Sequence, residues 1–118
     1  MTRMKIGRQG EVAIYRIDDL PKGIETRAVE RNKNGDSIVS HSESGNHHVI
    51  SGGVDVLERT NDVPDGMRIL YAILDEPQVL KQDATVPHGE ITLSPGVYEF
   101  RTAREHDHFT EQVRRVAD

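Results

Sequence analysis

Met67-Arg-Ile-Leu-Tyr-Ala-Ile-Leu74 is the most apolar stretch of this chain, and turn-forming residues lie on both sides of it. The loop 61–66 precedes the stretch and Pro77 follows it. A short apolar run between such breaks is typical of a strand that is buried on both faces. We therefore expect residues 67–74 to form the central strand of a β-sheet.

On both sides of this run, β-like segments alternate with Gly, Pro and Asn turns at intervals of about eight to twelve residues. Helical periodicity is nearly absent. The pattern predicts an all-β domain, a small barrel or sandwich of about eight short antiparallel strands. The further strands are expected at residues 11–17, 24–30, 36–41, 47–50, 54–59, 78–81, 90–93 and 97–103.

The turns also predict which strands pair as hairpins. Asn34-Gly35 suits a type I′ turn and is expected to pair the two strands that flank it. Ser44-Gly45-Asn46 is expected to pair the strand that carries His41 with the strand that follows it. Gly52-Gly53 and Ser94-Pro95-Gly96 predict two further hairpins in the same way.

The length of 118 residues fits one domain, which we place at residues 1–104. Residues 105–118 form a charged tail: a short helical turn, an arm that docks on a neighbour through Phe109, Val113 and Val116, or a frayed end. Only 35% of the residues are hydrophobic and five are aromatic, so the core is expected to be thin and aliphatic. Such a chain gains stability by self-association, and a homo-oligomer is expected.

The charge balance limits the partners. A formal net charge of −5 argues against general binding of nucleic acids or anionic membranes, because both need accumulated Lys and Arg. The absence of cysteine excludes disulfides, thiolate zinc sites and a thiol nucleophile. No apolar run approaches the ~18 residues of a membrane span. We expect a cytoplasmic protein, or a virion-associated one if it is a phage structural protein.

Four histidines form the first candidate site. His41, His47, His48 and His88 lie in two short segments beside predicted strands. If they converge with a carboxylate such as Glu43 or Glu90, they form a ligand set for zinc, iron or manganese. His47 and His48 cannot face the same way, since successive strand residues point to opposite sides. The alternative is hydrogen-bonded polar side chains with no metal, in which case no cofactor is expected.

A cupin barrel also takes histidine ligands from two separated segments, so a cupin-like metal-dependent enzyme is one hypothesis. This chain departs from that pattern, because no residue separates His47 from His48.

Arg101, Arg104, Glu105 and His106 form the second candidate site, at the end of the last predicted strand. The planar guanidinium groups suit bidentate contacts with a phosphate or carboxylate, which predicts a nucleotide or other small anion as ligand. The alternative is a solvated strand end in which these charges pair with one another.

The segments "GEVAIYRIDDLP", "SESGNHHVI" and "HGEITLSPGVYEFRTAREHD", with "RRVAD" at the end, resemble a family of small uncharacterised proteins from phages and bacteria. The resemblance spans most of the chain and implies no named activity. The leading hypothesis is a non-enzymatic binding or assembly protein of a phage or other mobile element, which acts through self-association or a protein partner. The metal-dependent enzyme and the binder of a small anionic ligand are the alternatives.

Overall fold

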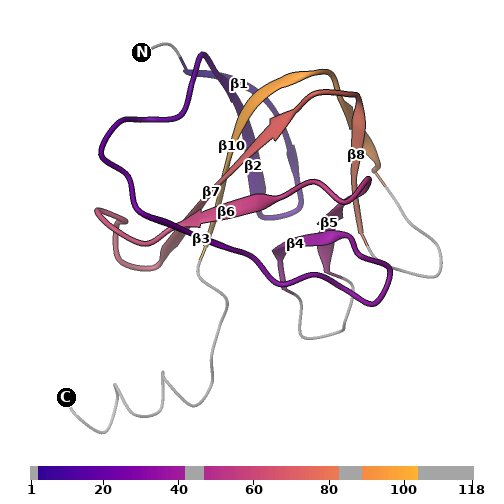
Figure 1. Cartoon of the computed structure of the whole chain (residues 1–118), viewed down its shortest axis with the longest axis horizontal. Coiled ribbons are helices and arrows are strands. Elements are labelled where there is room, and N and C mark those ends of the chain that lie inside the picture. Colours follow the sequence, from indigo (N-terminus) through magenta and orange to yellow (C-terminus); the bar gives the residue numbers. More distant parts are fainter. Residues whose placement is uncertain (1–2, 42–46, 83–88, 104–118) are drawn as a thin grey trace, which may run out of the picture.

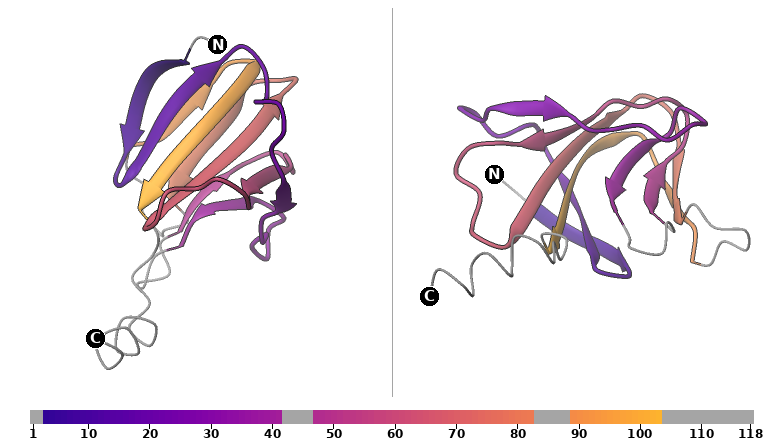
Figure 2. Two further views of the ribbon diagram at one scale, coloured as in Figure 1. Left: turned by 90° about the vertical axis from the view of Figure 1, so that its left-hand side faces the viewer. Right: turned by 90° about the horizontal axis from the view of Figure 1, so that it is seen from below.

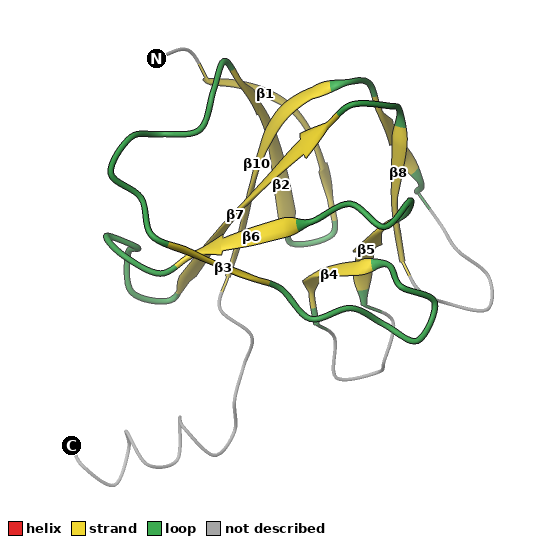
Figure 3. Ribbon diagram, viewed as in Figure 1, coloured by secondary structure: helices red, strands yellow, loops and turns green. Residues whose placement is uncertain are grey.

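The computed structural model describes residues 3–41, 47–82 and 89–103, which form ten strands in two antiparallel sheets and no helix (Figures 1 and 3). In spatial order, the six-stranded sheet contains β1 (Arg3–Gln9), β2 (Val12–Ile17), β10 (Gly96–Ala103), β7 (Met67–Leu74), β6 (Val56–Arg59) and β3 (Thr26–Ala28). The four-stranded sheet contains β4 (Ser37–Ser40), β5 (His48–Ile50), β8 (Gln78–Gln82) and β9 (Ile91–Leu93). The predicted all-β class is confirmed.

The main core lies between the two sheets, which are seen from two sides in Figure 2. Alternate residues of each strand point inward, as the strand period of two requires. The inward residues are buried and mostly aliphatic, with two aromatic rings from β10. They include Val12, Ile14, Val39, Ile50, Val56, Leu70, Ala72, Leu74, Leu80, Leu93, Tyr98 and Phe100.

A second apolar cluster lies on the outer face of the six-stranded sheet. Ile17, Ile69 and Tyr71 are buried there, and Leu20 and Ile24 from the β2–β3 loop pack against them. β7 is therefore covered on both faces, and it lies between β10 and β6 in the sheet. This explains its continuous apolar run and confirms it as a central strand.

The sequence pattern did not reveal β1. Most of its residues are exposed, it lies at the edge of the six-stranded sheet, and its register with β2 shifts between Lys5 and Gly7. The bulge interrupts the alternation by which a strand is usually detected. Lys and Arg side chains on such an edge also discourage pairing with another chain.

Of the four predicted hairpins, one is confirmed, one is confirmed in part and two are wrong. β4 pairs with β5, as expected. At the Asn34-Gly35 turn the chain reverses, Arg31 bridges Ser37, and the backbone N–H of Ile38 donates to the carbonyl oxygen of Glu30 at 2.9 Å, but β3 itself pairs with β6. After Gly52-Gly53 and again after Pro95, the chain crosses from the four-stranded to the six-stranded sheet. A turn sequence indicates that the chain reverses, but the burial of apolar faces decides which sheet the next strand joins.

The described residues contain no helix with the length and apolar character needed to cross a membrane.

Candidate functional site

The β4–β5 hairpin positions three of the predicted histidines. His41 follows β4 and His47 precedes β5, and their ring centroids lie 4.9 Å apart with an interplanar angle of 69°. Ser40 pairs in register with His48, so these two side chains share the opposite face. The structure thus brings His41 and His47 together and separates His48 from them, as strand alternation predicts.

His48 lies inside the sandwich, with only 2% of its surface exposed. Its Nδ1 atom is 2.8 Å from the Oε1 atom of Gln9, which is also buried. The Nε2 atom of Gln9 donates to the carbonyl oxygens of Leu80 at 3.0 Å and Gly89 at 2.8 Å. Because these donors orient the amide, its Oε1 atom accepts a hydrogen bond from Nδ1 of His48.

The other nitrogen of His48 faces the β1–β2 turn. Nε2 lies 3.5 Å from Oε2 of Glu11, and the hydroxyl of Ser40 donates to Oε1 of Glu11 at 3.0 Å. Gly10 has a φ of 56°, and a Cβ atom there would lie 3.2 Å from the His48 ring. Both the left-handed backbone conformation and the nearby ring therefore favour glycine at this position.

The pKa of Glu11 is held below its ordinary value of 4.5. Partial burial raises it, but hydrogen bonds from the Glu11 backbone and from Ser40, together with the charge and hydrogen bond of His48, outweigh that effect. This network joins the β1–β2 hairpin of one sheet to β5 of the other.

His41 lines a cleft of about 420 Å³ on the other face of the hairpin, together with Arg27, Glu58 and Arg68. Its Nε2 atom lies 3.4 Å from Oε2 of Glu30. Arg68 donates two hydrogen bonds to Glu58, at 2.8 and 3.2 Å. These bonds lower the pKa of Glu58 below 4.5, against the opposing effect of burial and with further help from the charges of Arg68 and Arg27.

These lowered pKa values predict a loss of stability in acid. The folded state holds Glu11 and Glu58 ionised, so their contribution is complete above the ordinary pKa of 4.5 and is lost as the pH falls through the lower folded-state values. We expect the free energy of unfolding in urea to fall between about pH 5 and pH 3, and Glu58→Gln to flatten part of that fall.

The matched control is Asp65→Asn, since Asp65 is exposed in the β6–β7 loop. It should keep the wild-type pH dependence. Equal slopes for Glu58→Gln and the wild type would contradict the assignment.

The remaining predicted residues are placed as follows. His88, Arg104, Glu105 and His106 lie outside the described residues. Among the residues that are described, no group of three or more His, Cys, Asp or Glu side chains is placed to hold a metal ion.

Arg101 lies on the outer face of β10, where its Nε atom donates to Oε2 of Glu99 at 3.0 Å. Arg3 donates to the same oxygen at 3.3 Å, and the Glu99 side chain is only 5% exposed. Arg101 therefore takes part in an intramolecular ion pair with Glu99.

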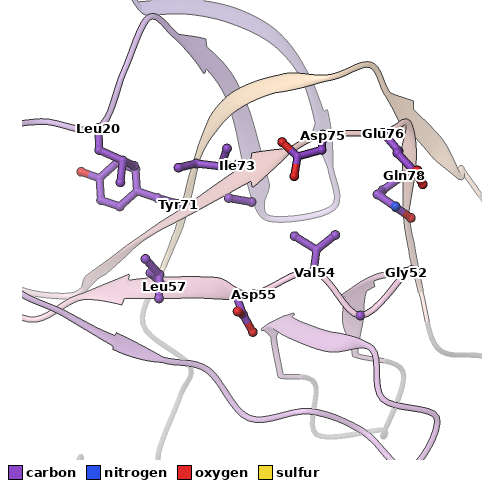
Figure 4. Close-up of a pocket in the computed structure, with 12 residues that line it drawn as sticks. Leu20, Gly52, Val54, Asp55, Leu57, Tyr71, Ile73, Asp75, Glu76 and Gln78 are labelled. Atoms are coloured by element: carbon purple, nitrogen blue, oxygen red, sulfur yellow. The ribbon is translucent and has the colours of Figure 1, made fainter.

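A second hollow, larger than the cleft at His41, is a groove of about 520 Å³, which sequence reasoning missed (Figure 4). β6 pairs with β7 only as far as Val56 opposite Ala72, whereas β7 continues to Leu74. Beyond this point, residues 52–55 line one side of the groove and Ile73, Asp75 and Glu76 line the other. We call this hollow the β6–β7 groove.

The β6–β7 groove has an apolar floor and an acidic rim. Leu20, Leu57 and Tyr71 line it, and Ile73 is 51% exposed beside them. Its charged lining residues are Asp55, Asp75 and Glu76, and Lys and Arg are absent from its lining. Burial raises the pKa of the Tyr71 hydroxyl and outweighs the lowering effect of the hydrogen bond from Arg59, and the charge of Glu99 raises it further. Tyr71 therefore stays neutral at physiological pH.

In the sequence, the only signal for this groove is Ile73, an apolar residue near the end of β7 that Leu74 separates from two acids. That signal is weak, because single exposed apolar residues are common.

The protein is thus an antiparallel two-sheet sandwich, and its six-stranded sheet carries an apolar groove with acidic residues at the rim. The chain belongs to the family described as Domain of unknown function (DUF8820), whose model matches residues 8–103. No curated protein and no solved structure was found to match it.

Proposed function

We propose that this chain is a non-enzymatic binding protein of a phage or other mobile element, and that the β6–β7 groove binds a polypeptide segment. The observation that supports this is the exposed Ile73 in an apolar hollow edged by Asp55, Asp75 and Glu76. Peptide-binding sites commonly combine apolar contacts, which supply affinity, with charges at the rim, which select the partner.

The ligand that fits this groove is a segment with apolar side chains and nearby Lys or Arg. Covering Ile73 removes apolar surface from water, which stabilises the complex by about 25 cal/mol per Å² of apolar surface buried. Cations on the segment meet the carboxylates of Asp75 and Glu76, both of which are exposed. Such surface charges attract the partner and are screened by salt, so binding should weaken as the ionic strength rises.

A random peptide library displayed on phage tests this function with a defined probe. We expect selection on the full chain to enrich peptides that combine apolar residues with Lys or Arg. Binding of the enriched peptides, measured by fluorescence polarisation, should weaken at least tenfold, about 1.4 kcal/mol, in Ile73→Asp. Asp75→Lys should weaken it several-fold.

Matched controls come from the same protein. Met4→Asp changes an apolar residue that is 59% exposed on β1, and Asp65→Lys reverses an exposed acid in the β6–β7 loop, beyond the end of β7 opposite to Ile73. Both should bind like the wild type. If no peptide is enriched, or if Ile73→Asp and Asp75→Lys bind as tightly as the controls while remaining folded, the proposed function is wrong.

A further inference from the structure

The chain carries a segment of its own with the composition that the β6–β7 groove requires. β10 ends at Ala103, where the family match also ends, and residues 104–118 follow. This segment, which we call the C-terminal arm, contains the apolar residues Phe109, Val113 and Val116. Arg114 and Arg115 lie between the two valines.

The composition of the arm complements the groove in apolar character and in charge. Its three apolar side chains match the apolar lining formed by Leu57, Tyr71 and Ile73. Within residues 113–116 the only charged side chains are Arg114 and Arg115, which match Asp75 and Glu76 at the rim. The acids of the arm lie outside this stretch, at Glu105, Asp107, Glu111 and Asp118. Apolar and electrostatic complementarity thus coincide within one short segment.

The direction of β10 favours a groove on another copy. Gly96 pairs with Leu74, near the groove, and Ala103 pairs with Met67 at the far end of β7. β10 therefore runs away from the groove over seven residue steps, about 23 Å. A return within one chain needs a reversal directly after Ala103, and the only turn-forming residue in residues 104–108 is Asp107.

We propose that the C-terminal arm of one copy docks in the β6–β7 groove of a second copy. Two copies can exchange arms reciprocally, which buries both grooves and closes the assembly as a dimer. This inference rests on the proposed function, because it names the segment that the groove binds.

Paramagnetic relaxation in a mixed sample tests the inference on the full chain. The chain contains no cysteine, so Ala117→Cys provides a single site for a nitroxide label. Labelled protein without ¹⁵N is mixed with an equal amount of unlabelled ¹⁵N protein. We expect enhanced relaxation at the amides of Asp55, Leu57 and Ile73 of the ¹⁵N copy.

Charge reversal identifies the contact. The combined variant Arg114→Glu, Arg115→Glu should remove the enhancement and raise the dimer dissociation constant at least tenfold in sedimentation. Mixing it with Asp75→Lys copies should restore part of the association, since the opposite charges then meet. A label at Asp65→Cys is the control and should leave the three groove amides unaffected.

No enhancement in the mixed sample would overturn the inference, and so would enhancement seen only in a second sample in which the nitroxide-labelled chain itself carries ¹⁵N. The peptide-library experiment separates this failure from that of the proposed function. If enriched peptides bind the groove but the relaxation experiment fails, only the inference is wrong. If neither experiment gives its expected result, the inference and the proposed function are both wrong.

Discussion

Replacing Gln9 with alanine is expected to lower the free energy of unfolding by about 3 kcal/mol. Gln9 is 6% exposed, donates to the carbonyls of Leu80 and Gly89, and accepts from Nδ1 of His48. The alanine variant leaves these three polar groups without their partner, and each such buried group costs about 1 to 3 kcal/mol. Urea unfolding at neutral pH measures the loss.

Two further variants make this prediction specific. Gln9→Glu keeps the size of the side chain but replaces its donor amide with a carboxylate that repels both carbonyls, so we expect a comparable loss. Thr92→Ala, at an exposed position in β9, should change stability by less than about 0.5 kcal/mol. A Gln9→Ala protein as stable as the Thr92→Ala control would show that the network does not hold the two sheets together.

Arg68→Met is expected to destabilise the protein by about 3 kcal/mol. The Arg68 and Glu58 side chains are 14% and 13% exposed and share two hydrogen bonds, so removing the guanidinium leaves a largely buried carboxylate without its main partner. The pKa of Glu58 should then rise, because its largest lowering influence is lost. Unfolding in urea, repeated from neutral pH to about pH 3, measures both effects.

Arg27→Met is the matched control for this prediction. Arg27 lies 3.5 Å from the same carboxylate of Glu58, but its side chain is 70% exposed. Exposed ion pairs contribute about 0 to 1 kcal/mol, so this variant should be nearly neutral. Equal losses in Arg27→Met and Arg68→Met would mean that burial does not decide the strength of the pair.

The two hollows have different chemistry. The His41 cleft contains opposite charges that already pair with one another, such as Arg68 with Glu58 and His41 with Glu30. In the β6–β7 groove, Ile73 is exposed, and Asp75 and Glu76 add negative charge beside Asp55, which pairs with Arg31. This difference is why the proposed function is assigned to the groove. It also yields a partner of defined composition, which the cleft does not.

Local patterns in the sequence predicted nine of the ten strands, since strand period, β-branched residues and turn residues act over a few neighbouring positions. The same alternation placed His47 and His48 on opposite faces. β1 escaped notice because its exposed, charged residues and its bulge remove the periodic signal.

Strand pairing and the sites depended on tertiary structure. Residues 54–59 and 97–103 follow turns, but they join the opposite sheet because their apolar faces complete the core there. Gln9 meets His48 across 39 positions of sequence, and Ile73 faces Val54 and Asp55 where β6 and β7 diverge. The sequence by itself thus determined the all-β class and the faces of its strands, which are local properties. Only the tertiary structure decided the partners of each strand, the buried network and the groove, because these depend on which distant surfaces exclude water together.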